Sequence, residues 1–177
     1  MSDKKAPWQR SFEAFAGRGI HQPSDMMRVA ESEARTLLAG LVAQDWLAPV
    51  YAGTGRHAGY TVGNATETCS TALFHAGTIV GFYAASSLWI AKAHRGLGLS
   101  TPLILAAAGQ RGGAILPAGV VVQGYTPAGV AAHRSAHSHA VLTAVAEGLP
   151  VPAAVLAEMR RHDCQRPQPA APCSCRP

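Results

Sequence analysis

The chain has 177 residues, enough for one domain with a hydrophobic core, and its 48% hydrophobic content excludes a disordered chain. The net charge of +5 suits anionic ligands but is too small to indicate nucleic-acid binding by itself. No apolar run reaches the length of about 18 residues needed for a membrane span, and the N-terminus lacks an apolar signal segment. We therefore expect a cytoplasmic protein with no membrane association.

The N-terminal half of the chain contains one helical segment followed by several strand-like ones. Residues 1–22 are predicted to form a weakly ordered arm, with a short helix near 11–16. Over 26–42 the apolar side chains recur at helical spacing, after Ser24, a residue type that favours the N-cap position. Strand-like apolar segments then follow in chain order at 46–51, 60–62, 71–75, 78–84 and 88–93.

Short turns and a second set of helices complete the expected fold. Ala76-Gly77 and Ser86-Ser87 are short enough to connect the last three strands as antiparallel hairpins. The later segments are expected to be a helix at 99–110, a strand at 120–125 and helices at 126–147 and 152–161. This order predicts an α+β fold with a central, mostly antiparallel sheet, in a single domain over 23–160.

Residues 161–177 are rich in proline, cysteine and arginine, and we expect a flexible tail there. The four cysteines, Cys69, Cys164, Cys173 and Cys175, include no C-x-x-C pair, so free thiols are expected rather than a zinc site. The arginines of the tail leave nucleic acid open as a partner.

The most informative segment is an apolar strand that runs into a glycine-rich turn and then directly into a helix. A helix start leaves backbone N–H groups without partners and carries a partial positive charge. Gly96 and Gly98 remove the Cβ atoms that would keep a ligand away from those amides, and Arg95 adds a full positive charge. The segment therefore predicts a phosphate-binding turn, with a purely structural glycine turn as the alternative. A dinucleotide-binding turn is disfavoured because Thr101 stands at the third glycine position of that pattern.

The residues from Arg95 to Ser100 resemble the [Q/R]-x-x-G-x-[G/A] signature of the GNAT superfamily of N-acetyltransferases, with Ser100 where the family has Gly or Ala. The segment from Thr126 to His133 is similar to the family's Asn-x-x-Ala-x-x-x-Tyr motif, with His133 in place of the tyrosine. The resemblance extends over roughly 68–148 and implies a GNAT-like fold, with a mostly antiparallel sheet and helices on both faces.

The resemblance implies that the chain binds acetyl-CoA and transfers the acetyl group to an amine of unidentified class. Turn amides and Arg95 would hold the pyrophosphate, and strand backbone would pair with the pantetheine arm. The residues implied in cofactor binding are Trp89, Ile90, Ala91, Arg95, Gly96, Leu97, Gly98, Leu99 and Ser100. His133 would act as the acid toward the CoA thiolate. A homodimer is left open.

The base that accepts the amine proton has one carboxylate candidate. Glu67 is the only acidic residue between Asp45 and Glu147, so we expect it to fill this role.

Three histidines form a second cluster, at positions 133, 137 and 139. His133 and His137 share a helix face, as metal-binding pairs do, but three histidines on a solvated helix face are the favoured interpretation. Two alternatives to a transferase stay open. One is a non-catalytic binding module of GNAT-like fold, and the other is a nucleic-acid-modifying protein with a metal at these histidines.

Overall fold

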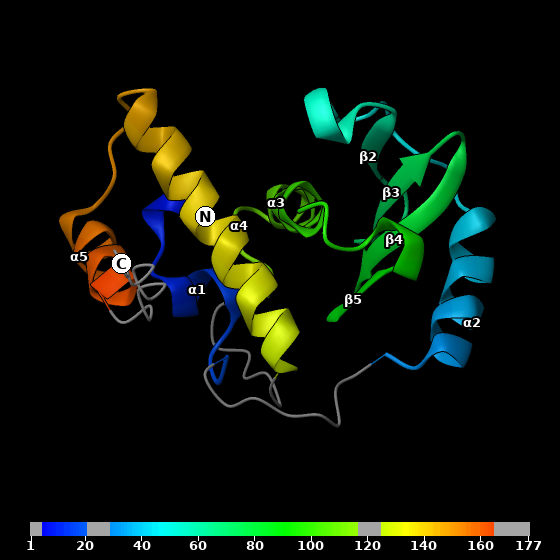
Figure 1. Ribbon diagram of the computed structural model, residues 1–177, viewed down its shortest axis with the longest axis horizontal. Coiled ribbons are helices and arrows are strands. Elements are labelled where there is room, and N and C mark those ends of the chain that lie inside the picture. The colour runs from blue at the N-terminus through cyan, green and yellow to red at the C-terminus, as the bar shows by residue number, and fades with distance from the viewer. Residues whose placement is uncertain (1–4, 21–28, 117–124, 165–177) are drawn as a thin grey trace, which may run out of the picture.

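A computed structural model describes residues 5–20, 29–116 and 125–164 (Figure 1). In chain order its elements are η1 (Pro7–Gln9), α1 (Phe12–Ala16), α2 (Glu31–Val42), β1 (Tyr51–Ala52), η3 (Gly55–His57), β2 (Tyr60–Asn64), β3 (Thr71–His75), β4 (Thr78–Ala84), β5 (Ser87–Ile90), η4 (Lys92–His94), α3 (Ser100–Gln110), α4 (Pro127–Ala146) and α5 (Ala153–Cys164). The predicted strand at 120–125 lies almost entirely outside the described residues.

The five strands form one antiparallel sheet in the order β1-β2-β3-β4-β5, so each strand pairs with the next one along the chain. Both predicted hairpins are confirmed: His75 pairs with Thr78, and Ala84 pairs with Ser87, so that the second turn is Ala85-Ser86, one residue earlier than predicted. The first turn has positive φ at both central residues, 48° at Ala76 and 76° at Gly77, as tight hairpin turns require.

Helices cover both faces of the sheet, and the predicted α+β fold is confirmed. On one face α3 packs against β2, β3 and β4, and α4 packs in turn against α3 (Figure 1). The main core lies there and includes Leu73, Tyr83 and Leu103. On the other face α2 covers Phe82 and Trp89, whose rings stack with centroids 5.7 Å apart. The glycine turn at the end of β5 therefore leads the chain onto the α3 face.

The N-terminal segment is part of the core, and the expectation of a weakly ordered arm over 1–22 is wrong for residues 5–20. Phe12 and Phe15 are 1% and 0% exposed and belong to the same buried cluster as the sheet residues. The Phe15 carbonyl accepts a hydrogen bond from the Ile115 amide at 2.8 Å. Two phenylalanines three positions apart place both rings on one face of α1, and that face packs against α4.

The boundaries of α3 and α4 follow the sequence signals closely, whereas α2 starts five residues later than predicted. The Thr126 hydroxyl oxygen accepts the Gly129 amide hydrogen at 3.1 Å, which confirms Thr126 as the N-cap of α4. The expected start of α2 at Ser24 lies outside the described residues, and α2 begins at Glu31. The backbone of α5 extends to Cys164, four residues into the predicted tail. Within the described ranges, no helix is long and apolar enough to span a membrane.

Candidate functional site

Two cavities meet at the glycine turn between β5 and α3, and Gly98 lines both of them. The smaller cavity has a volume of about 270 Å³ and lies between β5, the turn and the start of α4. The larger has a volume of about 650 Å³ and lies along α3, between η3 and the middle of α4. Neither wall includes an acidic side chain among the residues that the structure describes.

The smaller cavity is bounded on one side by β5, which is an edge strand of the sheet formed by the described residues. The Ala91 amide donates to the Val80 carbonyl at 2.9 Å, which places residue 91, and by alternation residue 89, in hydrogen-bonded contact with β4. The backbone groups of Leu88 and Ile90 therefore point away from β4, and both residues line the cavity. Of the three predicted pantetheine-binding residues, only Ile90 presents its backbone to the cavity.

The turn itself has the backbone conformation that its glycines allow. Gly96 and Gly98 have φ of 79° and 83°, in the left-handed region that other residues rarely adopt. Leu99 stands at the N-cap of α3 and gives no side-chain cap. The Thr101 amide donates to the Gly98 carbonyl at 3.2 Å and Pro102 has no amide hydrogen, so the amides of Leu99 and Ser100 are the ones left for a ligand. Of the turn residues expected to bind the cofactor, Gly96, Gly98, Leu99 and Ser100 line the cavity, whereas Leu97 does not.

Arg95 lines the smaller cavity but turns back onto the strand before it. Its Nε donates a hydrogen bond of 2.6 Å to the Ile90 carbonyl, one of the outward-facing groups of the β5 edge. The side chain therefore brings positive charge to the cavity and at the same time occupies one edge acceptor. The edge groups left for a ligand are the Ile90 amide and the Leu88 amide and carbonyl.

His133 lies in the core and lines neither cavity, so the prediction that it protonates the CoA thiolate is wrong for this conformation. It is 0% exposed, and its Nδ1 donates to the Gly129 carbonyl at 2.7 Å. Its Nε2 consequently accepts from the Tyr83 hydroxyl at 2.8 Å. Burial lowers the pKa of His133 from 6.5 to about 4, so the ring is neutral at pH 7. Tyr125, which contacts this ring, lines the smaller cavity instead.

Glu67 is also misplaced for its predicted role as the base. It is exposed in the connection between β2 and β3 and lines neither cavity. Glu67 is the sole carboxylate over a hundred residues of sequence, but this does not determine where it lies in the fold.

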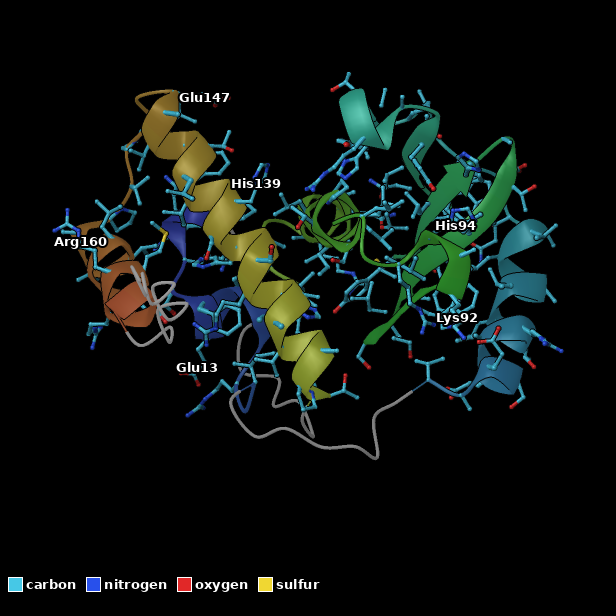
Figure 2. All side chains as sticks on the ribbon, viewed as in Figure 1. Glu13, Lys92, His94, His139, Glu147 and Arg160 are labelled. Atoms are coloured by element: carbon cyan, nitrogen blue, oxygen red, sulfur yellow. The ribbon has the colours of Figure 1, made fainter. Side chains whose placement is uncertain are left out.

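The three histidines of α4 do not form a metal-binding group. Both ring nitrogens of His133 are engaged, and His137 Nε2 donates to the Arg10 carbonyl at 2.9 Å, inside the N-terminal packing. Burial lowers the pKa of His137 as well. His139 is exposed and lines the larger cavity (Figure 2). Among the described residues, no group of three His, Cys, Asp or Glu side chains is arranged to hold a metal.

A second histidine cluster lies beside the turn. The Tyr60 hydroxyl and His94 Nδ1 are 2.8 Å apart, and the His75 ring packs against both rings, with centroids 4.5 Å from Tyr60 and 5.3 Å from His94. Of these three side chains only His94 lines the smaller cavity. The cluster fixes the orientation of His94 at the cavity wall.

Sequence reasoning missed Arg56 and His57, which η3 brings next to the turn. His57 Nε2 donates to the Leu97 carbonyl at 2.7 Å, and its Nδ1 lies 2.7 Å from the Tyr51 hydroxyl. Both Arg56 and His57 line the larger cavity. Their only sequence signal is a glycine-rich connection between two short strands, which does not indicate a contact forty residues away.

No family model matches the chain, and neither a curated protein nor a solved structure matches it. The function must therefore be inferred from the two cavities and from the motif that joins them.

Proposed function

We propose that the protein is an acetyl-CoA-dependent N-acetyltransferase of GNAT-like fold. The observation that carries this proposal is the smaller cavity, whose wall combines the outer edge of β5, unpaired among the described residues, with an α3 N-terminus that has no side-chain cap. A strand edge offers alternating amides and carbonyls to an extended polar chain, and a helix N-terminus favours phosphate. Acetyl-CoA joins these two chemistries in one molecule, as a pantetheine arm followed by a diphosphate.

The proposed binding mode gives the donor one direction. The diphosphate would lie on the amides of Leu99 and Ser100 with Arg95 beside it, and the pantetheine arm would extend along β5 toward Leu88. Thr126 and Gly129, at the start of α4, form the opposite wall. The thioester is then expected at the Leu88 end of the cavity, away from the turn.

In the proposed reaction the amine nitrogen of an acceptor attacks the thioester carbonyl carbon. The C–N bond forms, the C–S bond breaks, and the proton lost by the nitrogen balances the one gained by the thiolate. The buried His133 serves this site indirectly, since it packs against Tyr125 in the cavity wall at a ring-centroid distance of 4.5 Å.

One observation favours a second candidate, a CoA-binding module without catalysis. Neither side chain predicted to move protons, His133 or Glu67, reaches the smaller cavity. A module would bind the donor in the same way and release no thiol in the presence of amines, whereas the transferase would release one thiol for each amide formed.

The test is a Ser100→Asp substitution, measured by titration calorimetry with acetyl-CoA. An aspartate in the first turn of α3 suits the helix dipole, so we expect unchanged or slightly raised thermal stability. The same carboxylate repels a phosphate at that terminus, and we expect donor affinity to fall roughly tenfold or more.

The matched control is Ser32→Asp, the same change in the first turn of α2 on the other face of the sheet. It should leave affinity unchanged. Absence of acetyl-CoA binding by the wild-type protein, or equal affinity in Ser100→Asp, would contradict the proposal. Thiol release with a panel of amines then separates the transferase from the binding module.

A further inference from the structure

We infer that the larger cavity takes the phosphorylated nucleotide end of the donor and that Arg56 selects donors that carry a phosphate on the ribose. This inference rests on the proposed function, because it extends the same ligand from one cavity into the next. The phosphate on the ribose is then the feature by which the protein distinguishes acetyl-CoA from other acyl thioesters.

The first support is the continuity of the two cavities. Gly98 lines both, at the point where the proposed diphosphate lies. Arg56 is directly beside it: a Cβ atom on Gly98 would be 3.1 Å from Arg56 Nη2. His57 ties η3 to the same turn through its 2.7 Å hydrogen bond to the Leu97 carbonyl. A ligand that leaves the diphosphate position on this side therefore meets Arg56 first.

The second support is a guanidinium that has no acceptor in the part of the chain that the structure describes. Within the described residues, Arg56 forms no hydrogen bond or ion pair, although its guanidinium borders a cavity with no acidic side chain. Arg56 stands at the N-terminal end of α3, beside Gly98, and an arginine without an acceptor among the described residues suits a phosphate monoester at this point of the cavity wall.

The third support is the apolar part of the wall. Val50 on one side, and Pro102 and Leu105 on α3, offer surface to a flat ring. The volume of about 650 Å³ is within the range of sites that enclose a ligand of nucleotide size.

The direction of the donor also argues against the acceptor amine as the occupant. The proposed thioester lies toward Leu88, whereas the larger cavity opens from the Gly98 end of the smaller one. An amine bound beside Arg56 would therefore be separated from the thioester by the length of the pantetheine arm. The nucleotide end of the donor has no such conflict.

The experiment compares acetyl-CoA with 3′-dephospho-acetyl-CoA by calorimetry, on the wild-type protein and on Arg56→Ala. We expect the wild type to bind acetyl-CoA roughly tenfold or more tightly than the dephosphorylated donor, and Arg56→Ala to bind both about equally. Arg35→Ala is the control, because Arg35 is an exposed arginine on α2, across the sheet from the cavity. It should keep the wild-type preference. Circular dichroism of all three proteins reports whether they are folded.

Equal affinity of the wild type for the two donors, or a full preference in Arg56→Ala, would overturn the inference while leaving the proposed function intact. If the wild-type protein bound neither donor, the proposed function would be overturned. In that event adenosine 3′,5′-bisphosphate is titrated alone: binding that Arg56→Ala weakens and Arg35→Ala does not would still support a nucleotide-phosphate site at Arg56. Absence of that binding would overturn the inference as well.

Discussion

At the scale of single residues, His133 is the clearest departure from the N-acetyltransferase motif that the sequence resembles, and its side chain is buried. His133 takes the motif position of a tyrosine, yet Tyr83 and the Gly129 carbonyl engage both of its ring nitrogens. A neutral imidazole can accept one hydrogen bond and donate the other, and this matches the two partners. We conclude that the residue joins β4 to α4 rather than serving as an acid in the cavity.

The buried histidine makes stability depend on pH. The pKa of His133 is about 4 in the folded protein, because burial disfavours the charged ring, against 6.5 in the unfolded chain. The unfolded state therefore takes up a proton first as the pH falls, and stability present above pH 6.5 is lost between about pH 6.5 and 4. The loss is about 3 kcal/mol at about 1.4 kcal/mol per pH unit.

The measurement is urea denaturation between pH 7 and pH 4, on the wild type and on His133→Gln. The glutamine cannot titrate, so over this range the free energy of unfolding of the variant should fall by about 3 kcal/mol less than that of the wild type. His137, whose pKa is also lowered by burial, reduces the free energy of unfolding in both proteins as the pH falls. If the free energy of unfolding fell equally with pH in the two proteins, the pH dependence would belong to groups other than His133.

At the scale of elements, local sequence signals were sufficient wherever the physics is local. The Ala76-Gly77 turn and the Thr126 cap were predicted, and the second hairpin turn was placed within one residue of Ala85-Ser86, because a turn or a cap is set by a few neighbouring residues. The N-terminal segment was misjudged because its short helix is stabilised by Phe12 and Phe15, which pack against partners distant in the sequence.

The N-cap of α4 gives a test at this scale. Thr126→Ala removes the acceptor for the Gly129 amide, and the free energy of unfolding should fall by about 1 kcal/mol. Thr126→Ser keeps the oxygen and should stay close to the wild type. Chemical denaturation of the three proteins measures the difference, and an equal loss in the serine variant would show that the methyl group, rather than the cap, carries the effect.

At the scale of the molecule, the candidate site depends on contacts that no motif reveals. The turn at 95–100 could be predicted as a phosphate site because its glycines and the helix start are adjacent in sequence. The second cavity could not be predicted, because the pairing of β1 with β2 brings Arg56 and His57 to the turn, and no local sequence signal indicates this contact. Glu67 failed as a candidate for the same reason, since its place along the chain did not determine its place in the fold.

The packing of the N-terminal segment predicts that the described protein unfolds as one unit. Trp8 lies in η1, which packs against α3 and α4, and Trp89 lies in β5 against α2. Phe15 belongs to the core that connects these regions, so Phe15→Ala should lower the free energy of unfolding by about 3 to 5 kcal/mol.

The test uses single-tryptophan proteins that retain either Trp8 or Trp89, with phenylalanine at the other two tryptophan positions. In both proteins the unfolding midpoint measured by fluorescence should coincide with the midpoint measured by circular dichroism. Phe15→Ala should lower both equally, whereas Glu13→Ala, on the exposed side of α1, should lower neither (Figure 2). A shift confined to the Trp8 signal would mean that the N-terminal segment unfolds independently of the sheet.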